Sequence, residues 1–308
     1  MNKIFVLGSI NMDLVFTINQ MPKKGETIQG KGFFMSPGGK GANQAVACAK
    51  QGAKTQIIGS IGDDELSQLC KTSLLDFGVD CTYISELEGK TCGVAGIILE
   101  QQDNRIITDS GANEIHNINS ILNILNTEAK KSDILISQLE IPLDVILSTF
   151  YKAKEMHMFT ILNAAPVKLL PESMYPLIDI IAVNEIEMEM LTGIAPNNQK
   201  QIREAAEHLL RLGVQSVLLT LGELGSVYVS RNEIIQVGAY SVDVVDTTAA
   251  GDTYIGAFAS QLISGKSVKE AMKYATAASA LSIQSRGAQV AIPTKDQTLK
   301  FMKIQGVK

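Results

Sequence analysis

The chain has 308 residues, a formal net charge of −5 and a sequence pI of about 5.4. Hydrophobic residues make up 45% of it, which is enough to build one large α/β domain or one domain with an appendage. The sequence lacks the long lysine and arginine runs that bind nucleic acid or acidic membranes, so neither is an expected partner. No apolar run is long enough to span a bilayer, and we expect a cytoplasmic protein.

The cysteines and histidines argue against a metal site built from these residues and against hydrolase chemistry. The four cysteines form no Cys-x-x-Cys pair and lie in apolar or mixed segments, which favours reduced, buried thiols over disulfides or a metal site. The three histidines, His116, His157 and His208, are not spaced as ligands of one ion. A histidine metal centre and a Ser-His-Asp triad are therefore poorly supported.

Short apolar runs alternate with helical patterns along the chain. The runs predict strands at Ile4–Leu7, Gln56–Ile61, Asp133–Gln138, Met158–Asn163, Asp179–Asn184 and Ser216–Leu221. Helical patterns lie between them at Lys40–Lys50, Glu65–Phe77, Leu143–Lys154 and Ile202–Leu212. This alternation predicts an α/β fold with a mainly parallel central sheet, helices on both faces, and ligands at the carboxyl ends of the strands.

Two stretches, residues 14–36 and 91–110, interrupt the alternation with β-type patterns that no helix follows. Pro22 and several glycines punctuate the first, and a polar turn at Gln101-Gln102-Asp103-Asn104 divides the second. We interpret them as a small separate sheet, a lid over the strand ends, within a single domain of residues 1–308. A pair of surface hairpins is the alternative. An uncovered small sheet could also pair with a second copy of the chain.

Polar residues follow the first strand and precede the first helix. Asn11 and Asp13 come directly after Ile4–Leu7, and Glu140 follows a later strand. The motif Gly38-Gly39-Lys40-Gly41-Ala42-Asn43 opens a helix without the spacing of the common phosphate-binding loop, and it suggests close backbone approach to a small ligand. Each polar residue alone reads as a turn residue. Together, at strand ends far apart in sequence, they favour a polyol pocket.

Two further motifs suit a nucleotide. Asn184 and Glu187 lie three residues apart where a strand passes into a helix, a sparse amide and carboxylate pair that suits hydrated magnesium, although helix capping gives the same pattern. Thr220-Leu221-Gly222-Glu223-Leu224-Gly225-Ser226 predicts a strand, a glycine turn and a strand, against whose backbone a nucleotide could lie. A plain hairpin is the alternative.

The segment Val245–Thr253 joins a predicted strand to a predicted helix. Ser241–Val245 alternates like a strand, and Tyr254–Leu262 is apolar and helical. The first amides of a helix lack partners within it, so the small residues before Asp252 form a cup for phosphate. Asp252 at its rim can accept a hydroxyl proton, and we expect its helix position to lower its pKa. The alternative is an ordinary capping turn.

In this order, these motifs resemble the ribokinase-like family of carbohydrate kinases over essentially the whole chain. The resemblance rests on Gly8-Ser9-Ile10-Asn11-Met12-Asp13, the Gly38–Asn43 motif, Asn184-x-x-Glu187 and Asp246–Asp252. It implies transfer of the γ-phosphoryl group of ATP to the 5-hydroxyl of D-ribose. It also implies Mg²⁺ with ATP, K⁺ as a monovalent activator, and a homodimer joined through the lids.

The same resemblance assigns roles to residues. The sugar-binding set is Asn11, Asp13, Gly39, Lys40, Asn43 and Glu140. Asp252 corresponds to the catalytic base, with an anion hole supplied by Ala249, Ala250 and Gly251. The nucleotide set is Asn184, Thr220, Gly222, Gly225, Gly251 and Thr276. Glu187 corresponds to the group that organises magnesium, and the monovalent cation would be held by the loops that contain Asp246, Thr248, Ser282, Ser285, Gly287 and Ala291.

Other functions remain open at this stage. An amide at Asn11 can bond a sugar hydroxyl and so favours ribose over 2-deoxyribose. Kinases for deoxyribose, fructose or adenosine are the alternatives within the class, and a non-catalytic sugar or nucleotide sensor is the alternative outside it. A dinucleotide-dependent oxidoreductase is disfavoured, because Gly8 is followed by Ser9 and Ile10 instead of the expected glycine pattern.

Overall fold

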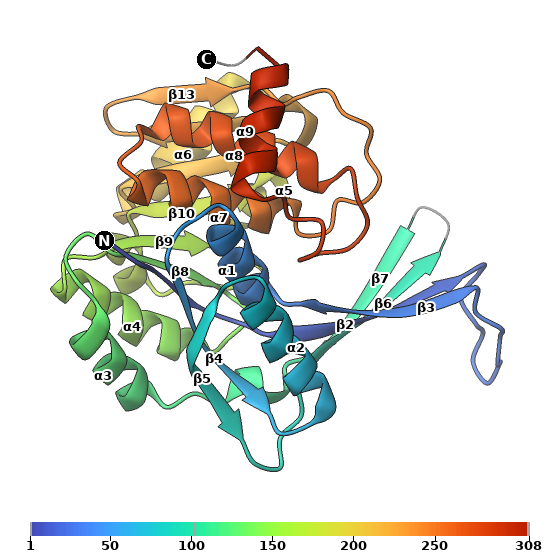
Figure 1. The fold of residues 1–308 in the computed structure, drawn as a ribbon. Coiled ribbons are helices and arrows are strands. Elements are labelled where there is room, and N and C mark those ends of the chain that lie inside the picture. The colour runs from blue at the N-terminus through green and yellow to red at the C-terminus, as the bar shows by residue number, and fades with distance from the viewer. Residues whose placement is uncertain (1, 101–102, 307–308) are drawn as a thin grey trace.

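A nine-stranded sheet forms the centre of the molecule. The computed structural model describes residues 2–100 and 103–306. The strand order is β13-β12-β11-β10-β9-β8-β1-β4-β5, parallel from β5 to β11 and antiparallel at β12 and β13 (Figure 1). The strands are β1 (Ile4–Leu7), β4 (Thr55–Gly62), β5 (Asp80–Leu87), β8 (Ile134–Gln138), β9 (Phe159–Asn163), β10 (Ile180–Asn184), β11 (Ser216–Thr220), β12 (Ser226–Ser230) and β13 (Ile234–Val237).

Helices cover both faces of this sheet, as predicted. They are α1 (Lys40–Lys50), α2 (Glu65–Asp76), α3 (Ile118–Glu128), α4 (Leu143–Glu155), α5 (Glu185–Thr192), α6 (Gln199–Leu212), α7 (Ala250–Ile263), α8 (Val268–Ser282) and α9 (Lys295–Ile304). Three short 3₁₀ segments accompany them: η1 (Gly111–Glu114), η2 (Glu172–Leu177) and η3 (Gly222–Leu224).

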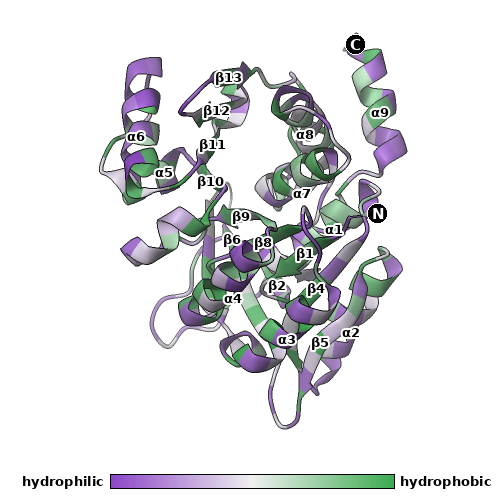
Figure 2. Ribbon diagram, turned by 90° about the vertical axis from the view of Figure 1, so that its left-hand side faces the viewer, coloured by the Kyte–Doolittle hydropathy of each residue, from purple (hydrophilic) through white to green (hydrophobic). Residues whose placement is uncertain are grey.

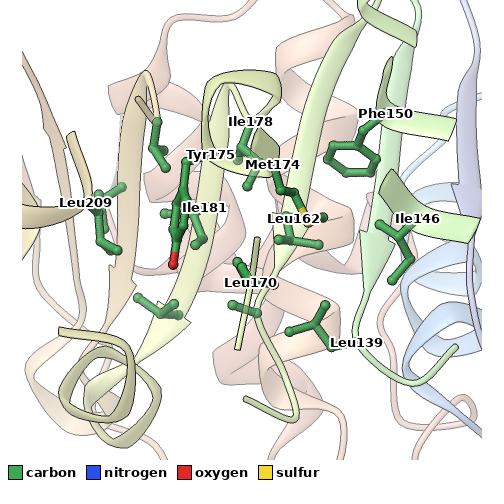
Figure 3. Packing of buried hydrophobic residues seen from close by; sticks show 14 of the residues in the cluster. Leu139, Ile146, Phe150, Leu162, Leu170, Met174, Tyr175, Ile178, Ile181 and Leu209 are labelled. Atoms are coloured by element: carbon green, nitrogen blue, oxygen red, sulfur yellow. The ribbon is translucent and has the colours of Figure 1, made fainter. Parts of the chain in front are cut away.

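Alternation along each strand divides the core into two layers. In β1, Phe5 and Leu7 join a cluster with α3, α4 and α6, whereas Ile4 and Val6 join a cluster with α1, α2, α7 and α8. Hydrophobic colouring accordingly concentrates on the strands and on the helix sides that face them (Figure 2). In the first layer, Phe150 of α4 and Met174 of η2 point toward the sheet around Leu162 (Figure 3).

A second, four-stranded sheet projects from the body, and we call it the lid sheet. Its order is β3-β2-β6-β7, built from β2 (Asn11–Ile18), β3 (Gly32–Gly38), β6 (Gly93–Glu100) and β7 (Asp103–Asp109) (Figure 1). The predicted small sheet is thus present, and its strands run further toward the core than expected, to Asn11 and Gly38. Of the predicted turn, Gln101 and Gln102 lie outside the described residues, while residues 103 and 104 begin β7.

The strand predicted at Ser241–Val245 is wrong. Between β13 and α7 the described chain has no strand, and Val244 and Val245 are 61% and 54% exposed. β13 already forms the edge of the sheet, and the Val245 N–H donates to the carbonyl of Ile283 at 2.8 Å instead of joining a ladder. The alternating valines lack a buried face to cover, and the segment lines a cavity described below.

Two smaller expectations concern the cysteines and the membrane. Cys48, Cys70, Cys81 and Cys92 are all free and buried, as predicted. Cys70 and Cys92 lie in contact, with their sulfur atoms 3.8 Å apart. Within residues 2–100 and 103–306, every helix is too short or too polar to cross a bilayer.

Candidate active site

Two adjoining cavities open at the carboxyl ends of the parallel strands. The smaller, about 220 Å³, is lined by residues from the ends of β9 and β10 and from the first turns of α1, α5 and α7, among them Lys40, Glu187 and Asp252. The larger, about 800 Å³, extends toward α8. Asn184, Thr220, Ala250 and Gly251 line both, so the two form one continuous site.

The predicted nucleotide residues gather in the larger cavity. They come from β10, β11, η3, α7 and α8, and all six line its wall: Asn184, Thr220, Gly222, Gly225, Gly251 and Thr276. Gly222 and Gly225 have φ angles of +50° and +96°, and an added Cβ at Gly225 would overlap the Val237 carbonyl. The turn after β11 therefore requires glycine and presents backbone to the cavity.

Asp252 is buried between the two helices that carry the site. Its side chain is 7% exposed, and its two oxygens accept hydrogen bonds from Asn43 Nδ2 at 3.2 Å and Gln44 Nε2 at 2.8 Å. Gly256, one turn later in α7, makes this possible, because an added Cβ there would overlap the Gln44 carbonyl and Ala47 of α1. The close approach of α1 and α7 thus fixes the carboxylate.

The expected depression of the Asp252 pKa is wrong. Burial raises the pKa of this carboxyl above its ordinary value, and the opposing effects of Lys40, Gln44 and Asn43 do not cancel it. The helix position favours the carboxylate only slightly, whereas removal from water disfavours the charged form strongly. Asp252 is therefore a stronger proton acceptor than its position at the helix start suggests.

The turn before α7 has an unusual backbone. Ala249 has φ +58° and ψ +16°, a left-handed conformation that is uncommon outside glycine, and it immediately precedes the helix. The Ala250 N–H donates to the Thr247 carbonyl at 3.1 Å, so it is engaged within the turn. Gly251 follows in the first helical turn, where amides have no acceptor within the helix. Of the predicted anion-hole residues, Gly251 is thus the best placed to donate.

The glycine motif at the start of α1 packs too closely for side chains. Gly39 has φ +85°, and a Cβ on Gly38 would overlap the Asp13 carboxyl. A Cβ on Gly41 would lie 2.5 Å from the Ser9 nitrogen. Between them Lys40 reaches the smaller cavity. Burial acts to lower the Lys40 pKa, but Asp252, Glu140, Glu187 and Asp13 raise it overall, so its ammonium group remains charged.

Asp13 and Glu140, two residues of the predicted sugar-binding set, lie near Lys40. Burial, with nearby Glu140 and Asp252, raises the pKa of Asp13 to about 7. One Glu140 oxygen accepts from Ser9 Oγ at 2.6 Å and from the Lys40 N–H at 3.0 Å. Several carboxylates thus face one ammonium group, so this part of the site is rich in hydrogen-bond acceptors.

Asn43 has a buried side-chain oxygen without a hydrogen-bond partner among the described residues. Its side-chain nitrogen donates to Asp252, while its Oδ1 is buried and has no partner among the described residues. A buried amide oxygen without a donor is costly and usually marks a ligand or water position. Asn43 therefore offers an acceptor beside Asp252.

Asn184 and Glu187 form a capping box at the start of α5. The Glu187 N–H donates to Asn184 Oδ1 and the Asn184 N–H donates to Glu187 Oε2, both at 2.8 Å. The capping interpretation is therefore correct, yet both residues also line the smaller cavity. Burial raises the pKa of Glu187 despite the Lys40 charge. The capping box uses only one of its two carboxylate oxygens, Oε2.

The segments predicted to hold a monovalent cation lie together. Asp246 Oδ1 accepts from the Thr248 N–H at 2.9 Å and from Thr248 Oγ1 at 2.6 Å, while Oδ2 accepts from the Gly287 N–H at 2.9 Å. The Val245 and Asp246 amides both donate to the Ile283 carbonyl. These bonds, with the charge of Arg286, outweigh desolvation and lower the pKa of Asp246. Asp246 thus ties the loop before α7 to the loop after α8.

Several residues that position the site were not predicted from the sequence. Gln44 lies next to Asn43, but a polar residue in an apolar helix gave no sign of its partner. Its Oε1 accepts from Gln138 Nε2 at 2.7 Å, and its Nε2 also donates to Asn163 at 3.1 Å. Ser9 lies in the Gly8–Asp13 motif, but the motif alone assigns it no role. Asn113, which bonds Asn11, carried no sequence signal at all.

Comparison with known proteins decides the family. The model of the pfkB family carbohydrate kinases matches residues 1–295. The chain belongs to this family. A pfkB relative, the ribokinase of Haemophilus influenzae, is 38% identical, with 97% of each chain covered. The deoxyribokinase of Salmonella typhi is 33% identical over 98% of this chain and 99% of its own.

A solved structure of the same family agrees with the fold. Ribokinase of Arabidopsis thaliana complexed with ribose and ATP superposes with a TM-score of 0.92 at 34% identity, covering 98% of this chain and 99% of its own. The family resemblance drawn from the motifs is therefore confirmed, as is the mainly parallel sheet with a smaller lid sheet.

Proposed function

We propose that the chain is an ATP-dependent ribokinase, which transfers the γ-phosphoryl group of ATP to the 5-hydroxyl of D-ribose and releases D-ribose 5-phosphate and ADP. One observation carries the proposal: Asp252 lies beside Gly251, where a cavity lined by the nucleotide residues meets a smaller one lined by Lys40 and Glu187. The ribose- and ATP-complexed Arabidopsis structure and the Haemophilus relative support the same assignment.

The site residues suit in-line transfer. Phosphoryl transfer has a loose transition state, so positioning and charge stabilisation matter more than base strength. Asp252 accepts the hydrogen bond and then the proton of the 5-hydroxyl as that oxygen attacks phosphorus. The Gly251 amide at the start of α7 and the Lys40 ammonium stabilise charge that develops on the transferred group. The bond between the γ-phosphorus and the bridging oxygen breaks, and ADP leaves with that oxygen on its β-phosphate.

The sugar pocket suits a neutral polyol. Asp13 and Glu140 accept from hydroxyls, and Asn11 contributes an amide that favours a substrate with a 2-hydroxyl. Gly39 and Asn43 complete the set, Asn43 through its buried unpartnered oxygen. The Salmonella typhi relative, a deoxyribokinase, makes 2-deoxyribose the second candidate, and the sugar assay below separates the two.

Two cations belong to the proposal. Glu187 and Asn184 would hold hydrated Mg²⁺ on the nucleotide, since an amide and a carboxylate with one free oxygen fit a metal that keeps most of its waters. The oxygen-rich loops around Asp246, Thr248, Ser282, Ser285, Gly287 and Ala291 fit K⁺ through carbonyl groups. Mg²⁺, when bound, offsets phosphate charge. The four free cysteines support a cytoplasmic location, and so does the proposed use of ATP.

We also propose that residues 14–36 and 91–110 form the lid subdomain of a single domain, residues 1–308, and that two chains associate through it. One face of the lid sheet exposes large apolar side chains, Phe33 at 54% and Ile107 at 71%, while Phe34, on the opposite face, is 46% exposed. The rings of Phe16 and Phe33 contact each other across β2 and β3, with centroids 4.8 Å apart and planes tilted by 40°. Such a surface favours burial against a second copy. Sedimentation of wild type and Phe33→Ser should give a dimer and a shift toward monomer.

A coupled assay for ADP release tests the function. Purified protein with ATP and Mg²⁺ is supplied with ribose, 2-deoxyribose, fructose or adenosine, each with and without K⁺. We expect ribose to give the highest kcat/KM and K⁺ to raise turnover. If ribose binds by calorimetry but no sugar triggers ADP release, the protein is a sensor and the proposal fails.

A further inference from the structure

Asn113 joins the end of the lid sheet to the sugar pocket. It lies in η1, four residues after β7, and is only 1% exposed. Its Oδ1 accepts from the Ile10 N–H at 2.9 Å, while its Nδ2 donates to the Ile10 carbonyl at 3.1 Å and to Asn11 Oδ1 at 2.8 Å. This buried side chain therefore uses its oxygen and both hydrogens of its nitrogen on two consecutive residues.

These contacts fix which way the Asn11 amide faces. A backbone N–H can only donate, so the Ile10 N–H requires the oxygen of Asn113 on its side. The nitrogen of Asn113 must then point at Asn11 and requires the Asn11 oxygen in return. The planar amide of Asn11 consequently turns its own nitrogen away from Asn113. The chain of donors and acceptors allows one orientation at both residues.

Space around the pair is as restricted as its hydrogen bonding. A Cβ on Gly93, the first residue of β6, would overlap both Asn113 Nδ2 and Asn11 Oδ1. Gly93 is paired with Asn11 across the two parallel lid strands. The glycine therefore leaves room for the asparagine pair and for little else, so Asn11 cannot relieve a lost bond by moving toward β6.

Asn11 and Asp13 together provide a position that suits a hydroxyl group. They are two residues apart in β2, so their side chains lie on one face of the lid sheet, while Met12 between them is buried on the other. Asn11 supplies a donor, and the Asp13 carboxylate supplies acceptors. A hydroxyl satisfies both, because its oxygen accepts from Asn11 while its hydrogen is donated to Asp13. A sugar without that hydroxyl leaves both groups unpaired.

We propose that Asn113 is a specificity-determining positioning residue, which holds the Asn11 nitrogen toward the sugar so that the pocket selects a substrate with a hydroxyl at the contacted carbon. This inference rests on the proposed function, in which that hydroxyl is the 2-hydroxyl of ribose. Asn113 acts through Asn11 and does not touch the sugar. It also ties discrimination to the position of the lid, because η1 continues directly from β7.

The test compares ribose with 2-deoxyribose in wild type, Asn113→Ala, Asn11→Ala and the double variant. We expect Asn113→Ala to lower the ratio of kcat/KM values for the two sugars about tenfold, mainly through the KM for ribose, with the KM for ATP unchanged. Asn11→Ala should lower it similarly, and the double variant no further, because both changes remove one interaction. Asn123→Ala, an exposed asparagine of α3, is the matched control.

Two results would overturn the inference: an unchanged ratio in Asn113→Ala, which includes an equal loss with both sugars, or additive effects in the double variant. If Asn113→Ala does not fold, Asn113→Ser replaces it, since a hydroxyl can still accept from Ile10 but is too short to reach Asn11. Wild type without ribose-dependent ADP release would overturn the proposed function and this inference together. Active wild type with an unchanged ratio overturns the inference alone.

Discussion

The sugar side and the nucleotide side of the site are built differently. Around the sugar pocket, glycines pack so closely that an added Cβ at Gly8, Gly38, Gly41 or Gly93 would overlap neighbouring atoms. On the nucleotide side, a Cβ at Gly222 or Gly251 would meet nothing within 4 Å, although one at Gly225 would overlap the Val237 carbonyl, and the cavity is more than three times larger. The sugar side thus has little space for additional side-chain atoms, whereas most of the nucleotide side has room for them.

Charge follows the same division. Asp13, Glu140 and Asp252 surround Lys40 on the sugar side, and burial raises the pKa of Asp13 and Asp252. The larger cavity is lined instead by apolar and aromatic side chains, small residues and hydroxyls, with Glu185 and Glu223 as its charged residues. The comparison teaches that substrate choice and chemistry are concentrated in the rigid, crowded half. The following changes test that division.

The largest effect is expected for Asp252→Asn. The amide cannot accept the hydroxyl proton, so kcat should fall about 10²-fold or more while ATP affinity is nearly unchanged. Steady-state kinetics with ribose measures both. Asp76→Asn, an exposed aspartate at the end of α2, should behave as wild type. Near-normal turnover in folded Asp252→Asn would contradict its assigned role.

Gly41→Ala should destabilise the protein itself. The new methyl group would lie 2.5 Å from the Ser9 nitrogen and 2.6 Å from the Gly8 carbonyl carbon, so β1 and α1 must separate. Overpacking of this kind costs roughly 1–3 kcal/mol or more, and we expect a Tm loss of several degrees. Gly238→Ala has open space and should leave Tm unchanged. Equal Tm values for the two variants would contradict the tight packing inferred for the sugar side.

Asp13→Asn should stabilise the sugar-free protein above neutral pH. The folded pKa of about 7 exceeds the ordinary aspartate value of 3.8, so wild-type stability falls as pH rises through this range and stays low above it. Asparagine removes that penalty. Thermal unfolding should therefore show a Tm gain of about 3 °C or more at pH 8 that shrinks toward pH 4. Ribose affinity should fall in the same variant, and a constant Tm difference across pH would refute the explanation.

Gln44→Met should produce the smallest change. Loss of the 2.8 Å hydrogen bond removes an interaction that favours the Asp252 carboxylate, so its pKa should rise further. The acid limb of the kcat/KM profile for ribose should then move to higher pH, with recovery at alkaline pH. Gln68→Met, exposed on α2, controls for the substitution. A uniform loss at every pH would indicate a purely structural role.

Much of the fold was predictable because its signals are local. Apolar runs, helix starts and the Gly38–Asn43 motif depend on neighbouring residues, and β1, α1 and the strand ends lie where expected. The strand predicted at Ser241–Val245 is wrong, since an alternating pattern does not reveal that β13 already occupies the edge of the sheet. The Asp252 pKa and the Gln44 contact depend on packing between residues 208 positions apart, which no local pattern encodes.

The cluster of acidic groups around Lys40 has a consequence for product release. Four carboxyl groups act on this one ammonium group, from Asp252, Glu140, Glu187 and Asp13. A neutral sugar enters such a pocket without electrostatic penalty. Once phosphorylated, the sugar carries a dianion in a cavity where negative charge outnumbers positive charge, and like charges repel more strongly away from water. In the proposed function, the groups that bind the sugar therefore also repel the phosphorylated product, and sugars that are already phosphorylated or carboxylated should be poor competitors for the site.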